Sequence, residues 1–357
     1  MSAKVFFAPL KQEMNSEPFA KLNTLLSKIN ISNTFNKNEL VAVKAHFGEF
    51  GNTAVLRPIF LHPVISELKK IQAKPYLTDT NTLYVGMRTN SIDHIHSAAY
   101  NGFNFSSLHA PVIIADGLRG ENNKEVETNL PMCDKVHLAG DMVNADGMVC
   151  VSHFKSHEVV GLGGAIKNLS MGCASREGKL DMHSSTRPRV DKSKCIACGK
   201  CLDACQVEAI EINDSAYITE RCVGCARCIA VCPEHAIKIN WNETATNTQK
   251  KMSEYAYGIN KALNFNILYI NILYSITLAC DCEGGNGRPV VPDIGIVAST
   301  DPVAIDRASY DLVQKAYGGD PFREFHCQID PDIQINYAEE LQIGTTDYQL
   351  VEIKDES

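Results

Sequence analysis

Apolar runs of strand length alternate with helical patterns along most of the chain. Seven runs have the length and the flanking turn residues that are typical of buried strands. They cover residues 4–9, 40–45, 75–78, 111–115, 148–152, 267–276 and 294–298. Between them, apolar residues recur every three or four positions, as they do on one face of a helix. This alternation predicts an α/β fold with a mainly parallel sheet.

Start and stop signals mark some of these helices. The predicted helices cover residues 19–29, 64–71, 91–101 and 253–263. A further helix should begin at Asp301 and Pro302, because Asp caps the first turn and Pro suits the first helical position. Gly318 predicts its end, since glycine readily adopts the left-handed conformation of a C-cap.

A cysteine-rich segment interrupts the alternation. Eight of the 14 cysteines lie between Cys195 and Cys232, and a shift of 27 residues maps the first four onto the second four. Each half reads C-x2-C-x2-C-x3-C, and the match continues into the apolar residues that follow. Each half is too short to bury a core alone, so bound metal must contribute much of the folding free energy.

This cysteine spacing is typical of the ligands of two [4Fe–4S] clusters. In the two-cluster arrangement, the fourth cysteine of each run ligates the cluster that the other run holds. The predicted ligand sets are Cys195, Cys198, Cys201 and Cys232 for one cluster, and Cys222, Cys225, Cys228 and Cys205 for the other. The alternative is a pair of zinc sites, but the extra cysteines have no use in a tetrahedral site. The segment resembles bacterial-type two-cluster ferredoxins across its whole length.

We therefore predict a discontinuous, mainly parallel α/β domain that is interrupted by a small α+β ferredoxin-like domain. The α/β domain comprises residues 1–187 and 243–357, and the ferredoxin-like domain comprises residues 188–242. The length of 357 residues also favours two units, because it exceeds the size of one compact core.

Charge and terminal sequence narrow the function classes. The formal net charge is −8 and no cluster of Lys and Arg offsets it, which argues against nucleic-acid binding. The chain does not begin with a secretory signal, so we expect a cytoplasmic protein whose thiols stay reduced. Three Asn residues break the apolar stretch 263–280, which predicts a buried strand region and no membrane span.

Polar residues recur directly after the predicted strands. In open α/β sheets, ligands bind beyond the carboxyl ends of the strands, where the following loops converge. The groups at 44–49, 79–81, 116–117, 153–158 and 280–282 should therefore line one cleft.

Four residues in or near these groups are the candidates for catalysis. Lys155, His157 and Lys167 could bind or protonate an anionic substrate, and His46 could be a second proton donor. For His46 alone, a buried structural histidine is the alternative.

The run GLGGAIKNLSMG at residues 161–172 places glycines between cationic side chains. Such a turn can bind an anion through its backbone N–H groups, which makes Gly163, Gly164 and Asn168 candidate cofactor-binding residues. The run matches neither a Walker A loop nor a dinucleotide-binding turn, so it predicts no nucleotide. A solvated loop with packing glycines is the alternative.

Six cysteines remain outside the two ligand sets. Cys173, Cys280 and Cys282, with the histidines of the run 152–173 and His183, are candidates for a third metal site or a reactive thiol pair, with buried packing as the alternative. Cys133, Cys150 and Cys327 have no partner by spacing, and we predict that they lie in the core.

The chain as a whole resembles the domain of unknown function 362 family. The resemblance rests on KAHFGE at 44–49, GLGGAIKNLSMG at 161–172, CDC at 280–282 and PDIGIVASTDPVAIDRAS at 292–309. Members of that family frequently carry a two-cluster ferredoxin module. The resemblance implies the inserted-domain architecture and an iron–sulfur protein, without naming a substrate.

These observations lead to three hypotheses about function. The first is an iron–sulfur oxidoreductase that passes electrons from a redox partner protein, through the ferredoxin-like domain, to a small anionic substrate or cofactor in the cleft. The second is an electron carrier whose α/β domain docks a partner enzyme. The third is a protein in which the clusters stabilise the fold or sense oxygen and iron.

Overall fold

The computed structural model describes residues 2–10, 18–285 and 287–353, and its centre is an eight-stranded sheet. The strand order is β16-β1-β15-β14-β7-β2-β3-β4. These strands are β1 (Ala3–Pro9), β2 (Leu40–Lys44), β3 (Lys74–Asp79), β4 (Val112–Ile114), β7 (Gly147–His153), β14 (Ile267–Leu273), β15 (Gly295–Ser299) and β16 (Tyr348–Glu352). Only β15 runs antiparallel to its neighbours in this sheet, which confirms the predicted mainly parallel α/β fold.

Alternate residues of the central strands pack into cores on opposite faces of the sheet. Ala42 of β2 lies in one core, whereas Val41 and Val43 lie in the other. In β14, Tyr269 and Ile270 divide in the same way. This arrangement explains the nearly continuous apolar runs in the sequence, because a strand that is covered on both faces has no polar side.

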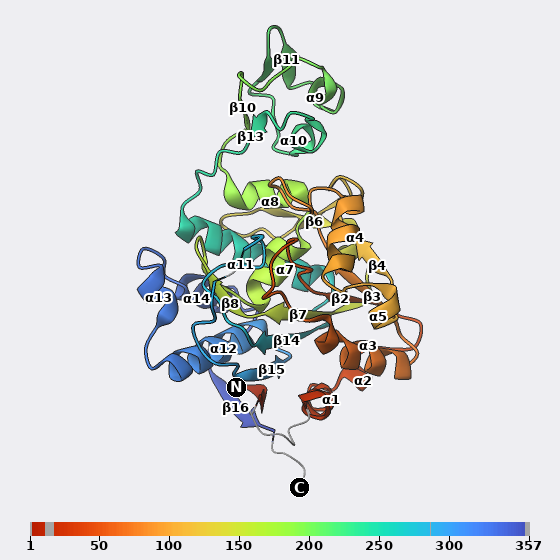
Figure 1. The fold of residues 1–357 in the computed structure, drawn as a ribbon, viewed down its shortest axis with the longest axis vertical. Coiled ribbons are helices and arrows are strands. Elements are labelled where there is room, and N and C mark those ends of the chain that lie inside the picture. The colour runs from red at the N-terminus through yellow and green to blue at the C-terminus, as the bar shows by residue number, and fades with distance from the viewer. Residues whose placement is uncertain (1, 11–17, 286, 354–357) are drawn as a thin grey trace.

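Helices cover both faces of the sheet (Figure 1). The helices that contribute to one core are α6 (Gly140–Val143), α7 (Ala165–Cys173), α8 (Arg176–His183), α11 (Ala245–Ala262), α12 (Pro302–Tyr317), α13 (Pro321–Phe325) and α14 (Asp332–Glu340). Those that contribute to the other are α1 (Pro18–Lys28), α2 (Ile31–Thr34), η1 (Pro58–Phe60), α3 (Leu61–Lys70), α4 (Ser91–Tyr100) and α5 (Phe105–Leu108). Two antiparallel hairpins lie outside the sheet, β5 (Asn123–Glu127) with β6 (Lys135–Ala139) and β8 (Lys155–His157) with β9 (Gly161–Gly163).

The local signals in the sequence agree with several helix ends. Asp301 caps α12 by accepting hydrogen bonds from Val303 N and Ala304 N, and Gly318 ends that helix with φ 79°. The predicted helix at 253–263 was too short, because α11 begins eight residues earlier, at Ala245, where Thr244 caps it. The run 161–172 is not a solvated loop: it forms β9 and most of α7.

The stretch 263–280 contains β14, a fully buried strand at the centre of the sheet. In the part of the chain that the structure describes, no helix has both the length and the apolar character needed to cross a membrane.

The cysteine-rich segment forms a small module that projects beyond α8, at the end of the molecule opposite β16 (Figure 1). Its elements are β10 (Arg189–Val190) paired with β13 (Ile237–Lys238), β11 (Ile210–Ile212) paired with β12 (Ala216–Ile218), α9 (Lys200–Asp203) and α10 (Arg227–Val231). The sequence duplication is also a structural one, because β10 and α9 begin 27 residues before β12 and α10.

The two cysteine loops of the module share an unusual backbone conformation. Positive φ occurs at Ala197 and Gly199 in the first loop, and at Gly224 and Ala226 in the second. These are equivalent positions after the shift of 27 residues. Two alanines adopt a conformation that normally favours glycine, which shows how tightly each loop is wound.

Candidate functional site

The strand-end groups converge on a cavity beside the carboxyl ends of β2, β3 and β7. Side chains of four predicted groups line this cavity, together with α7 and α8. The fifth group, at 116–117, does not line the cavity. Its Asp116 accepts hydrogen bonds from the backbone and side-chain amides of Asn81. Among the lining residues are the predicted His46, Lys155, His157, Gly163, Gly164, Lys167, Asn168, Cys280 and Cys282.

Asp281 anchors one wall of the cavity. Its carboxylate lies 2.9 Å from His153 Nδ1 and also accepts from Lys155 Nζ, and all three side chains are buried. Burial alone would raise the pKa of Asp281, but the charge of Lys155 and the hydrogen bond with His153 hold it far below its ordinary value. Lys155, predicted to bind or protonate substrate, is therefore committed to an ion pair within the protein.

His46 lies beside Arg88, whose Nη1 is 2.8 Å from His46 Nε2. Burial and the charge of Arg88 lower the pKa of His46 to about 3. The ring is therefore neutral near pH 7 and lacks the second proton of an imidazolium. Arg88 itself is buried and also binds Glu49 and Tyr84. No motif in the sequence marks Arg88, because it lies within a loop, away from any strand end.

The glycine-rich turn binds an anion, but that anion belongs to the protein. The carboxylate of Asp306, on α12, accepts hydrogen bonds from Ala165 N at 2.7 Å and Ile166 N at 2.9 Å. A Cβ on Gly164 would lie 2.3 Å from Asp306 Oδ1. Gly164 therefore permits this close packing, and the N–H groups at the start of α7 are already occupied.

Asn168 is also engaged inside the protein. Its Oδ1 accepts from Lys44 Nζ at 2.7 Å, and its Nδ2 donates to Val151 O and Ser152 Oγ. Lys44 in turn pairs with Asp79 at 3.0 Å. The side chain of Asn168 thus links α7 to the ends of β2 and β7.

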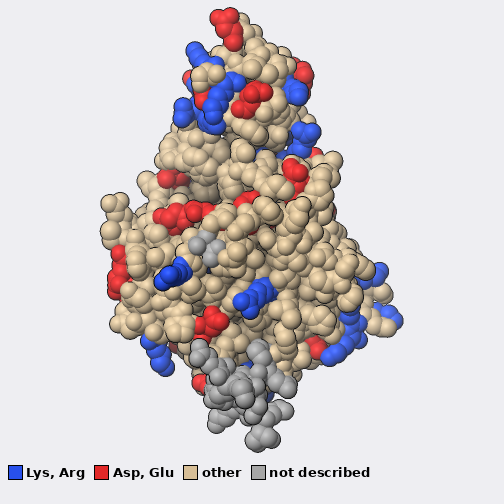
Figure 2. Space-filling model, viewed as in Figure 1, with Lys and Arg blue, Asp and Glu red and all other residues tan. Residues whose placement is uncertain are grey.

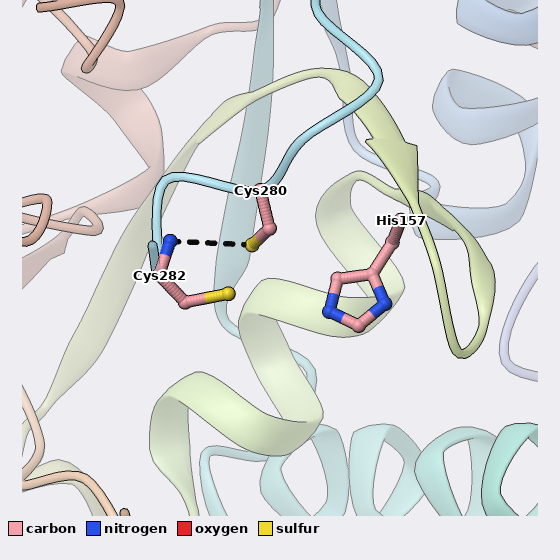
Figure 3. A group of neighbouring side chains, drawn as sticks. All are labelled: His157, Cys280 and Cys282. Carbon is pink, nitrogen blue, oxygen red and sulfur yellow. Dashed lines mark hydrogen bonds between the residues drawn. The ribbon is translucent and has the colours of Figure 1, made fainter. Parts of the chain in front are cut away.

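His157, Cys280 and Cys282 form the group that comes nearest to a metal site in the described chain. Their ligand atoms all lie within 4.8 Å of one another (Figure 3). Lys167 Nζ lies 3.7 Å from Cys280 Sγ, and Cys282 N lies 3.4 Å from the same sulfur. Three soft ligands at this distance could hold one ion.

The third predicted cysteine of this group, Cys173, is not part of it. Cys173 is buried in the core at the end of α7, and its thiol donates to Asn168 O. Burial raises its pKa to about 12. The prediction that grouped Cys173 with Cys280 and Cys282 was therefore wrong, because α7 directs this thiol into the core and His157 takes the third position.

The cysteines without a predicted partner divide into two kinds. Cys133 and Cys150 are buried in the core, as predicted. Cys327 is exposed, which contradicts its predicted place in the core.

The cavity carries a surplus of cationic side chains. Four Lys and Arg residues line it, against two acidic residues, Asp79 and Asp281. Lys167 has Cys280 as its hydrogen-bond partner, while Lys179 donates to Thr80 Oγ1 and to Ala174 O. A cationic cavity in a chain with a net charge of −8 favours an anionic ligand.

Two further cavities lie in the module, and four cysteines line each of them. One is lined by Cys195, Cys198, Cys201 and Cys232, and the other by Cys205, Cys222, Cys225 and Cys228. In both cases the fourth cysteine comes from the opposite half of the duplication. Backbone N–H groups also donate to three of these sulfurs: Ala209 to Cys205, Ala236 to Cys232 and Ala216 to Cys195. Such donors favour thiolates.

The module contacts the wall of the cationic cavity. Ala226, in the second cysteine loop, packs in one apolar cluster with Leu180 of α8 and Leu83. Leu83 also lines the cationic cavity, and Ala226 lines the second cysteine cavity. This apolar cluster thus adjoins both cavities.

Charges of both signs occur on the visible face of the module, with Lys and Arg on both flanks and Asp and Glu among them (Figure 2). This face offers no continuous basic stripe of the kind that follows a nucleic-acid backbone.

Comparisons with solved structures give weak likenesses. The chain is similar to the lactate racemase apoprotein from Thermoanaerobacterium thermosaccharolyticum, with 12% identity and a TM-score of 0.42, over 87% of this chain and 57% of that one. It is also similar to a structural-genomics protein from Thermotoga maritima, with 12% identity and a TM-score of 0.40, over 89% of this chain and 61% of that one. The chain thus spans about three fifths of either structure.

A search of curated proteins finds no match to the chain. A family model does match: the one for the domain of unknown function (DUF362) covers residues 41–311, which is most of the sequence. The chain therefore belongs to the DUF362 family.

Proposed function

We propose that the protein is an iron–sulfur oxidoreductase whose module, residues 188–242, binds two [4Fe–4S] clusters and supplies electrons to a small anionic molecule in the cationic cavity. The observation that carries this proposal is the pair of four-cysteine cavities, each completed by a cysteine from the other half of the duplication. This crossed pattern is the one that two-cluster ferredoxins use.

Sulfur spacing favours clusters over single zinc ions. Zn–S bonds of about 2.3 Å place tetrahedral ligands roughly 3.8 Å apart. Within the described residues, the one group of His, Cys, Asp and Glu side chains arranged to hold a single metal ion is His157, Cys280 and Cys282, and it includes none of the eight module sulfurs. A cubane cluster holds its four thiolates farther apart than one ion does, which fits four-cysteine sets that form no single-ion group.

The apolar contact between the module and the α/β domain supports electron delivery to the cavity. The loop that carries Cys222, Cys225 and Cys228 includes Ala226, which packs against Leu83 and Leu180. The other set includes Cys198, which is exposed. We propose that a redox partner protein docks near Cys198. The cluster held by Cys205, Cys222, Cys225 and Cys228 would then be the one nearer to the cationic cavity.

Metal analysis tests the clusters directly. Protein purified without oxygen should contain about eight irons and eight acid-labile sulfides per chain, as two [4Fe–4S] clusters require. Dithionite should bleach the visible absorption and produce the electron paramagnetic resonance signal of reduced clusters. Cys225→Ser should remove about half of the iron, and the matched Cys327→Ser should remove none. Zinc in place of iron and sulfide would refute the proposal.

A further inference from the structure

We propose that Cys280 is a nucleophilic thiolate with Cys282 as its resolving partner, and that this pair exchanges with small anionic disulfides in the cationic cavity. Both cysteines line that cavity, and Cys280 is 6% exposed. The pair lies beside His157 and is separated in sequence by Asp281 (Figure 3).

Several donors surround the sulfur of Cys280. The ammonium group of Lys167 lies 3.7 Å away, and the backbone N–H of Cys282 lies 3.4 Å away. Both groups stabilise a thiolate more than a thiol, because each places positive charge next to the sulfur. The turn that carries both cysteines is held in place, since Asp281 binds His153 and Lys155, and Tyr84 Oη donates to Cys282 O at 3.1 Å.

The hydrogen bonds of His157 favour this thiolate over a bound metal ion. Val159 N lies 3.1 Å from His157 Nδ1, and an N–H donor needs an acceptor that carries no proton. The network therefore leaves Nδ1 without a proton and places the N–H of the ring on Nε2, the nitrogen that faces the two sulfurs (Figure 3). A metal bound at Nε2 would require the proton on Nδ1, where Val159 opposes it.

The electrostatic balance of the pair agrees with this geometry. The pKa of Cys280 lies well below its ordinary value, owing to hydrogen bonding with Cys282 and the charge of Lys167, although burial opposes the shift. The pKa of Cys282 is raised well above its ordinary value by the same hydrogen bond and by burial. These directions agree with the contacts, because the ammonium group of Lys167 and the backbone N–H of Cys282 both lie next to the sulfur of Cys280.

The exchange runs in two steps that balance. The Cys280 thiolate bonds to one sulfur of the substrate disulfide, and the other sulfur leaves as a thiolate. Cys282 then loses its proton to that leaving thiolate and displaces the second substrate sulfur, which leaves as a thiolate; the products are a Cys280–Cys282 disulfide, one substrate thiol and one substrate thiolate. Two electrons and one proton restore the thiolate of Cys280 and the thiol of Cys282. This last step rests on the proposed function, because the clusters would supply both electrons.

Two disulfides of equal length and opposite charge test the proposal. Reduced protein is mixed at pH 6 with 3,3′-dithiodipropionate, a dianion, or with cystamine, a dication, and modification is followed by peptide mass spectrometry. Exposed Cys327 is the reference within the same molecule. At pH 6 an ordinary thiol with a pKa near 8.5 is only about 0.3% thiolate. Cys280 should therefore react at least tenfold faster than Cys327, and faster with the dianion.

Variants separate charge stabilisation from a structural role. In the Cys282→Ser variant, the exchange should stop at the mixed disulfide on Cys280. The Lys167→Met substitution should slow the reaction of Cys280 about tenfold at pH 6, but should change it little at pH 9, where the thiolate forms without help from Lys167. The proposal would be overturned if Cys280 reacted no faster than Cys327, or if stoichiometric zinc blocked Cys280. Iron is measured on the same samples. Fast exchange in protein without iron would refute only the proposed iron–sulfur function. Slow exchange in protein with eight irons would refute only the proposal that Cys280 is a thiolate.

Discussion

The module and the α/β domain bring their reactive side chains together in opposite ways. In the module, three ligands of each proposed cluster lie within seven consecutive residues, and the apolar core comprises only six buried residues. In the α/β domain, the cavity joins His46 to Cys282 across most of the chain, over large cores on both faces of the sheet. Short-range spacing builds the first site, whereas only closure of the sheet builds the second.

This difference predicts that the two regions depend on different sources of stability. The module lacks the apolar surface to fold alone, so bound metal must contribute most of its folding free energy. The α/β domain draws its stability from burial in its two cores. Three changes test this contrast, in order of decreasing effect.

Removal of iron should unfold the module and spare the sheet. After oxidative chelation, amide hydrogen exchange in residues 189–240 should approach the rate of an unfolded chain, because the remaining core is small. Amides of the central strands β7 and β14 should keep their protection, since these strands are fully buried. A module that stays protected without iron would show that its apolar core suffices.

Asp281→Asn should be the most costly single change in the cavity. It leaves Lys155 and His153 buried without their anion, at a cost of about 3–5 kcal/mol in the free energy of unfolding. Urea denaturation checks this value, and Glu283→Gln, an exposed neighbour, is the matched control. An equal effect of both substitutions would contradict the buried network.

Asp281 also gives the free energy of unfolding a defined dependence on pH. The folded pKa of Asp281 is depressed, so its contribution is present above the unfolded pKa of about 3.9 and is lost as pH falls below it. The wild-type protein should therefore lose more stability than Asp281→Asn when the pH is lowered through this range.

Gly164→Ala and Gly163→Ala form a smaller, matched test of the glycine-rich turn. The new Cβ at 164 would lie 2.3 Å from Asp306 Oδ1, whereas at 163 it would meet only Lys167 Cδ at 3.5 Å. We expect a loss of about 1–3 kcal/mol for the first and little change for the second. If instead both substitutions lowered the affinity for an anionic ligand equally, without loss of stability, the turn would have the binding role that the sequence suggested.

Local patterns determined a large part of this protein. The period of apolar residues identified the strands of a mainly parallel sheet, and Asp301 with Gly318 marked the ends of α12. Cysteine spacing also indicated the two sets that the structure places around separate cavities. These features depend on residues close in sequence, where backbone geometry fixes which side chains can meet.

Tertiary structure alone decided which distant side chains meet. It placed Asp306 against the turn at 164–166, directed Cys173 into the core and brought His157 to Cys280 and Cys282. It also buried Arg88 beside His46. No spacing encodes these contacts, because each depends on how helices and loops far apart in the chain pack once the sheet has formed.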